Sequence, residues 1–102
     1  MVPEVTPAEA RVRQVRGAVL VDVREDNEWQ EGHVSGALHI PLGALPQRLG
    51  ELDPTKEVIT VCRSGNRSAF AADVLLKAGF PRVSSMAGGT VAWTGQGLPV
   101  SH

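Results

Sequence analysis

The chain has 102 residues, of which 42% are hydrophobic, and its formal net charge at pH 7 is −1. This length allows one domain with one hydrophobic core, and the composition excludes a disordered tail. The nearly neutral charge gives no basis for binding nucleic acid or an anionic membrane surface. No apolar run approaches the roughly 20 residues of a membrane span and no leader-like segment begins the chain, so we expect a cytoplasmic protein with no membrane partner.

The first part of the chain predicts a helix followed by a buried strand. Thr6 and Glu9 form a capping-box pattern with Pro7 between them, which indicates a helix that ends near Gly17. Residues 18–23 are a short run rich in valine, which is typical of a strand covered on both faces.

The next segments are shorter. Residues 25–31 predict a polar helix with Trp29 as its apolar anchor, 38–40 a brief strand, and 42–49 a further helical segment. Val58, Ile59, Thr60 and Val61 predict a second buried strand after a turn at Asp53 and Pro54.

After the loop at 62–68 the alternation continues. A helix is expected to about Ala78 with Gly79 as its left-handed stop, then a strand over 83–86 and a last helix that holds Trp93. Strands separated by helices imply an α/β fold in which a mostly parallel sheet has helices on both faces.

Cys62 is the single cysteine of the chain, which has consequences for its chemistry. No disulfide can form within the chain, and no second thiol can resolve an oxidised Cys62. His33, His39 and His102 show none of the paired spacings with Cys62 that zinc sites use. We therefore expect no metal site.

Cys62 lies directly after a predicted strand, and the residues that follow it curl into a helix. Ligands of open α/β sheets bind beyond the carboxyl ends of the strands, and backbone N–H groups at such a turn can converge on an anion. A thiolate would be favoured there over a thiol, as a sulfur nucleophile requires. A lone cysteine is more often an inert core residue, but this polar, glycine-containing loop favours a functional Cys62.

The other residues of the loop can serve the same site. Gly65 allows the backbone to turn, and Arg63 and Arg67 add positive charge for an anionic substrate. Each arginine could equally be a solvated surface charge or part of a salt bridge that holds the loop. Ser64, Asn66 and Ser68 are expected to offer polar groups around the rim.

Three motifs in the expected order resemble those of rhodanese domains, over roughly residues 4–100. They are Val21-Asp22-Val23-Arg24-Glu25 with Glu31-Gly32-His33-Val34-Ser35-Gly36-Ala37 and Ile40-Pro41; the loop Cys62-Arg63-Ser64-Gly65-Asn66-Arg67-Ser68; and Met86-Ala87-Gly88-Gly89 with Trp93 and Gly97-Leu98-Pro99. The resemblance implies a single rhodanese domain over 1–102, with a three-layer α/β/α architecture around a five-stranded sheet.

The same resemblance implies a sulfurtransferase. Cys62 would take a sulfane sulfur from a small anion such as thiosulfate and pass it, as a persulfide, to a thiol, a protein acceptor or cyanide. The loop residues Arg63 to Ser68 would bind the substrate. No metal or organic cofactor is implied, because sulfur itself is the carried group.

Other residues of these motifs are better explained by structure. Asp22 and Arg24 are expected to be hydrogen-bonded groups at a strand end, and His33 is expected to brace a loop. Trp29 and Trp93 are expected to be core anchors. Gly88 and Gly89 are expected to allow close packing beside the loop and not to bind phosphate.

Two other functions remain open at this point. A phosphatase or arsenate reductase of related fold needs five residues between its cysteine and arginine, whereas four separate Cys62 from Arg67. The shorter loop suits one sulfur better than a tetrahedral oxyanion. A sulfur-relay module that serves a protein partner is the other possibility, and the sequence does not separate it from a thiosulfate enzyme.

Overall fold

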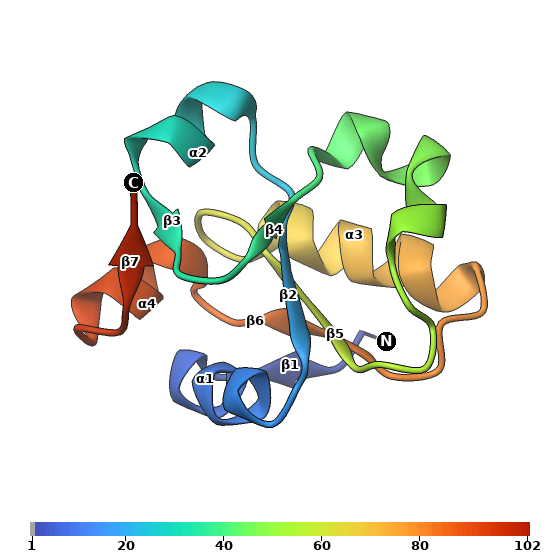
Figure 1. Ribbon diagram of the computed structural model, residues 1–102, viewed down its shortest axis with the longest axis horizontal. Helices are drawn as coiled ribbons and strands as arrows, with labels where there is room; N and C mark the ends of the chain where they lie inside the picture. Colours follow the sequence, from blue (N-terminus) through green and yellow to red (C-terminus); the bar gives the residue numbers. More distant parts are fainter. Residues whose placement is uncertain (1) are drawn as a thin grey trace.

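A computed structural model describes residues 2–102 and shows a central sheet with helices on both faces (Figure 1). The sheet has five strands in the order β1-β6-β5-β2-β4, and every neighbouring pair is parallel. The strands are β1 Glu4–Val5, β2 Val19–Asp22, β4 Leu38–His39, β5 Val58–Val61 and β6 Val83–Met86. The predicted α/β architecture with a five-stranded sheet is confirmed.

The helices divide into two layers. On one face α1 contacts α4, and on the other face α3 packs against β5, β6 and the 3-10 helix η1. Their bounds are α1 Pro7–Val15, α2 Asp26–Glu31, α3 Asn66–Lys77 and α4 Gly89–Gly95, with the 3-10 helices η1 Leu42–Gln47 and η2 Leu49–Glu51.

Alternation along the buried strands produces two hydrophobic cores. Leu20 and Ile59 belong to the core under α1 and α4, whereas Val21 and Val58 belong to the core under α3. Successive side chains of a strand point to opposite faces, so a run of apolar residues supplies both cores at once. This is why β2 and β5 appear in the sequence as continuous hydrophobic runs.

A second, two-stranded sheet was not predicted. β3 His33–Val34 pairs antiparallel with β7 Val100–Ser101, which brings the end of the described chain beside α2 and α4 (Figure 1). The Oγ atoms of Ser35 and Ser101 lie 2.6 Å apart and add a side-chain bond to this pairing. The small sheet forms one wall of the cavity described below.

Two local predictions need correction. Thr6 does cap α1, since it accepts from the Glu9 N–H at 3.2 Å, but the Glu9 carboxylate accepts from Arg13 Nε at 3.0 Å and does not reach back to the cap. Trp29 is not a core anchor. Its ring is half-buried and stacks between His33, at a centroid distance of 3.5 Å, and His39, at 4.7 Å.

Trp93, by contrast, is fully buried, and its Nε1 donates to the Pro99 carbonyl at 2.8 Å. The prediction that Trp93 anchors the core is confirmed. Across residues 2–102, no helix combines the length and apolarity needed to cross a membrane.

Candidate functional site around Cys62

Cys62 lies at the carboxyl end of β5, between the ends of β2 and β6, and α3 begins four residues later at Asn66. The turn between them depends on Gly65, whose φ of +110° falls in the left-handed region that side chains disfavour. The Cys62 side chain is 1% exposed and packs in the core beneath α3. The loop therefore wraps around a buried sulfur.

The Cys62 sulfur lies among hydrogen-bond donors. The Gly65 N–H donates to Sγ at 3.0 Å, and the Ser68 Oγ lies 3.4 Å from it. Burial alone would raise the pKa of the Cys62 thiol, but these bonds outweigh burial and hold the pKa below its ordinary value. The groups that lower the pKa are the Ser68 hydroxyl and the backbone N–H groups of Ser68, Gly65 and Ser64. The arrangement favours a thiolate.

Ser68 is not at the rim, where the sequence placed it. It is fully buried, and its Oγ lies 2.7 Å from the Oγ of Ser85, which is also fully buried. Thr60 Oγ1 donates to the Ser68 carbonyl at 2.7 Å, so β5 and β6 both hold this first turn of α3. Sequence reasoning missed Ser85. Its one signal is a pair of serines inside the otherwise apolar strand β6.

The two arginines of the loop differ. Arg67 donates bidentately to Glu28 of α2, at 2.7 and 2.9 Å, and this bond lowers the pKa of Glu28 to about 2. Arg67 thus fits the alternative in which a salt bridge holds the loop. Arg63 is exposed and makes no ion pair with the described residues. Ser64 and Asn66 are also exposed.

We expect Glu28→Gln to destabilise the protein by about 1 kcal/mol at pH 7, because the ion pair is partly exposed. The folded pKa of Glu28, about 2, lies below its ordinary 4.5. The stabilisation is therefore present above about pH 4.5 and is lost as pH falls towards 2. Urea unfolding across this range tests the expectation, with Asp73→Asn as a control from an exposed pair. A stability difference that stays constant to pH 2 would contradict it.

The start of α4 docks on the backbone of the loop. The N–H groups of Thr90 and Val91 donate to the carbonyls of Cys62 and Arg63, at 2.8 and 3.2 Å. A Cβ on Gly89 would lie 2.3 Å from the Arg63 carbonyl carbon and oxygen. The prediction that the two glycines allow close packing beside the loop is confirmed at Gly89.

The remaining motif residues have structural partners. Arg24 binds the fully buried Asp22 through Nε and Nη2, at 2.7 to 3.0 Å, and Nη2 also donates to the Gly32 carbonyl at 2.8 Å. His33 Nδ1 is hydrogen-bonded to the Trp29 carbonyl at 2.9 Å, as expected of a brace. Among residues 2–102, no group of three or more histidine, cysteine, aspartate or glutamate side chains could hold a metal ion.

Comparison with known proteins matches the model of the rhodanese-like domain to residues 6–96. The chain belongs to the rhodanese family. The fold supports this, because a rhodanese-related protein from Thermoplasma volcanium superposes with a TM-score of 0.89 at 27% identity, over 97% of each chain. The resemblance to rhodanese domains in the three sequence motifs is confirmed.

Two curated proteins are similar to this chain in sequence. "Putative sulfur carrier protein YrkF" of Bacillus subtilis strain 168 is 40% identical over 76% of this chain, which spans 42% of that protein. The thiosulfate sulfurtransferase GlpE of Stutzerimonas stutzeri is 34% identical over 87% of this chain and 82% of its own length. Of these two relatives of the chain, one is named as a sulfur carrier and the other as a thiosulfate sulfurtransferase.

Proposed function

We propose that this rhodanese transfers sulfur through a persulfide on Cys62. In the first step the Cys62 thiolate attacks the outer sulfur of a donor such as thiosulfate. A new S–S bond forms, the S–S bond of thiosulfate breaks, and sulfite leaves with its electron pair. In the second step a thiol or cyanide takes the outer sulfur, and the electron pair of the broken bond restores the Cys62 thiolate. The transferred group is the outer sulfur itself, and Cys62 carries it between the two steps. No cofactor enters either step.

The observation that carries this proposal is the donor set around the Cys62 sulfur. Gly65 N–H lies 3.0 Å from Sγ, and hydrogen bonds hold the pKa of Cys62 below its ordinary value despite full burial. The same N–H groups would stabilise the terminal anionic sulfur of a persulfide. A loop with four residues between Cys62 and Arg67 suits one sulfur, which is why we place the phosphatase alternative last.

The loop residues would share the binding of the donor. Ser64, Gly65 and Ser68 supply N–H groups at the sulfur. Arg63, which is exposed, would attract the anion, and Asn66 would bind it at the open side. Arg67 would contact the donor over a smaller range of positions than Arg63, because the bond to Glu28 holds its guanidinium in place.

Intact-protein mass after incubation with thiosulfate tests the mechanism. Wild-type protein should gain one sulfur mass, and cyanide should remove it and release thiocyanate. Cys62→Ser should gain nothing. A gain on the serine variant would place the sulfur elsewhere, and no gain on wild type would exclude thiosulfate as a competent donor. Hydrolysis of an aryl phosphate faster than sulfur transfer would favour the phosphatase instead.

A relay role is the second candidate, supported by the carrier name of the Bacillus relative. In that role Cys62 would be loaded by a persulfide on another protein. Slow loading by thiosulfate but rapid loading by a persulfurated desulfurase would select the relay. Rapid loading by thiosulfate with efficient turnover would select the enzyme.

A further inference from the structure

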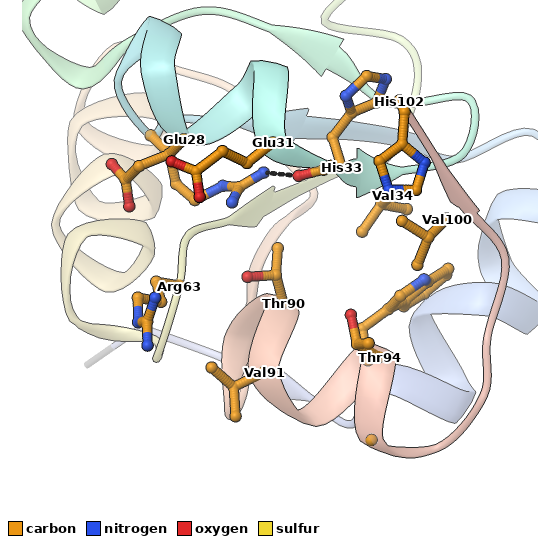
Figure 2. A pocket seen from close by; sticks show the side chains of 14 residues that line it. Glu28, Glu31, His33, Val34, Arg63, Thr90, Val91, Thr94, Val100 and His102 are labelled. Atoms are coloured by element: carbon orange, nitrogen blue, oxygen red, sulfur yellow. Dashed lines mark hydrogen bonds between the residues drawn. The ribbon is translucent and has the colours of Figure 1, made fainter.

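Two cavities lie in different parts of the molecule. One, of about 540 Å³, lies between α2, α4 and the β3–β7 sheet, with Glu31 on one wall and Arg63 across from it (Figure 2). Arg63 belongs to the Cys62 loop, so this cavity is part of the surroundings of the site already described. The other, of about 560 Å³, is lined by none of the loop residues, and we call it the basic cavity.

The basic cavity lies at the amino ends of three strands. Its lining includes Ala18, Glu57 and Arg82, which directly precede β2, β5 and β6. Cys62 directly follows β5, and the three strands run parallel. The four residues of β5, at about 3.3 Å each, therefore set the cavity about 13 Å or more from the Cys62 loop. Figure 1 shows this separation, with α1 below the sheet in this view and the loop after β5 above it.

Positive charge is concentrated in the basic cavity. Its charged lining residues are Glu9, Arg13, Arg16, Lys56, Glu57 and Arg82. They include four of the ten arginine and lysine residues of the chain, but two of its eleven aspartate and glutamate residues. The cavity is thus positive on a chain whose formal net charge is −1.

The two carboxylates of the lining are neutralised within the protein. Arg13 binds Glu9 through Nε at 3.0 Å and Glu57 through Nη1 at 2.6 Å. The exposed lining residues that form no ion pair with residues 2–102 are Arg16, Lys56 and Arg82. Three positive charges therefore remain available to a ligand.

The fold explains one of these three charges without a ligand. Arg16 is the C-cap of α1, where positive charge complements the helix dipole. Lys56 and Arg82 have no helix end to complement. Arg82 is also held in position, because its Nη2 donates to the Thr55 carbonyl at 2.5 Å, which leaves its other N–H groups for a carboxylate.

The size and chemistry of the basic cavity favour a peptide over a small anion. At about 30 Å³ for each water molecule, 560 Å³ holds about 19 of them, far more space than one phosphate needs. The end of α1 forms part of the lining, and the last carbonyls of a helix accept hydrogen bonds and carry partial negative charge. A peptide can donate its N–H groups to such carbonyls while its carboxylates bind the cations. A polyphosphate offers acceptors only.

We propose that the basic cavity binds an acidic segment of a partner protein. Carboxylates of the segment bind Lys56 and Arg82, with Arg16 at the end of α1 as the third cation. The segment docks at the edge of the sheet opposite to Cys62 and leaves the Cys62 loop open. The partner therefore holds the domain without occupying the place of sulfur transfer. This inference needs no sulfur on Cys62 and is independent of the proposed function.

Fluorescence anisotropy with a labelled hexaglutamate peptide tests the proposal, with hexaglutamine as the uncharged control. Wild-type protein should bind hexaglutamate at one saturable site and hexaglutamine not at all, and added salt should weaken the binding. Unlabelled hexaglutamate should displace the probe better than tripolyphosphate at an equal concentration of negative charge. Stronger displacement by tripolyphosphate would overturn the assignment to a peptide, and no binding of hexaglutamate at low salt would overturn the site.

Two pairs of matched variants locate the bound peptide. Lys56→Gln should raise the Kd about threefold to fivefold, whereas Lys77→Gln, which removes the same charge from α3 on the other face of the sheet, should leave it unchanged. Glu57→Gln removes a negative charge and frees one side of Arg13, so it should lower the Kd, whereas Asp73→Asn on α3 should not. Equal effects within either pair would show attraction to net charge alone and would overturn the site.

Sulfur loading separates this proposal from the proposed function. Saturating hexaglutamate should leave the loading of Cys62 by thiosulfate unchanged, because the cavity and the sulfur lie at opposite edges of the sheet. Loss of loading on addition of the peptide would contradict docking at the far edge. Failure to load without the peptide, with hexaglutamate still bound as expected, would contradict the proposed function and leave the docking site supported.

Discussion

Gly89→Ala is expected to destabilise the protein by about 2 to 5 kcal/mol and to abolish sulfur loading of Cys62. The backbone of Gly89 has φ +58°, which costs a residue with a side chain about 1–2 kcal/mol. The added Cβ would also lie 2.3 Å from the Arg63 carbonyl and 2.4 Å from the Cys62 carbonyl. Both contacts are with backbone, so no flexible side chain can give way. The loop must move, and the donors around the sulfur move with it.

Thermal unfolding measures the loss of stability, and the intact-protein mass after incubation with thiosulfate measures the loss of sulfur loading. The rate of alkylation of Cys62 reports whether the donors around the sulfur have moved. A loss of 2 kcal/mol corresponds to a melting temperature lower by roughly 8 °C or more in a domain of this size. Gly43→Ala is the matched control, because a Cβ there meets nothing within 4 Å and its φ is not positive. If Gly89→Ala kept both its melting temperature and its rate of alkylation, the close approach of α4 to the loop would be wrong.

The strands that the sequence predicted well are those with a simple physical signal. β5 and β6 were predicted with their observed bounds. β5 is a short, mostly apolar run after a turn, whereas β6 contains two serines and was predicted from its place between the helix that ends near Gly79 and the glycines at 88 and 89. The left-handed glycines at positions 17, 65 and 79 were also found, since a helix end or a tight turn requires them. The loop at Cys62 followed from its place between a strand and a helix.

The parts that the sequence did not predict depend on contacts between distant segments. β3 and β7 have two residues each and are stabilised by pairing with one another across the chain. Residues 42–49 were expected to form one helical segment, but Pro46 lacks an N–H, and the segment forms 3-10 turns instead. Trp29 has the spacing of a core residue, but its partners are two histidine rings that no periodicity indicates.

The candidate site shows the same division. Cys62 and the turn at Gly65 could be placed from local sequence, but the partners of the loop could not. Glu28 is 39 residues from Arg67, and Ser85 is 17 residues from Ser68. The cavity joins α2, α4 and the β3–β7 sheet, so no single motif contains it. The position of Cys62 was therefore predictable from local sequence, whereas the contacts that surround its loop became visible only in the fold.

Ser68→Ala is expected to raise the pKa of Cys62. In the structure the Cys62 thiol donates to the Ser68 Oγ at 3.4 Å, and the Ser68 hydroxyl donates to the Gly65 carbonyl at 3.1 Å. When Cys62 loses its proton, the hydroxyl can turn and donate to the thiolate, which lowers the pKa of Cys62. A hydrogen bond to a charged group contributes about 1.5–3 kcal/mol, and one pKa unit corresponds to about 1.4 kcal/mol. Below both pKa values the thiolate fraction should fall about tenfold or more, and at high pH the two proteins should react alike.

The rate of alkylation of Cys62 by iodoacetamide as a function of pH measures this shift. Ser64→Ala is the control, because Ser64 is exposed and contributes through its backbone N–H, which alanine retains. Ser85→Ala should shift the pKa in the same direction by less, since Ser85 acts on the sulfur through Ser68. If Ser68→Ala left the midpoint of the profile unchanged, the backbone N–H groups of the loop would account for the lowered pKa alone. The buried serine pair would then serve packing and not the reactivity of the sulfur.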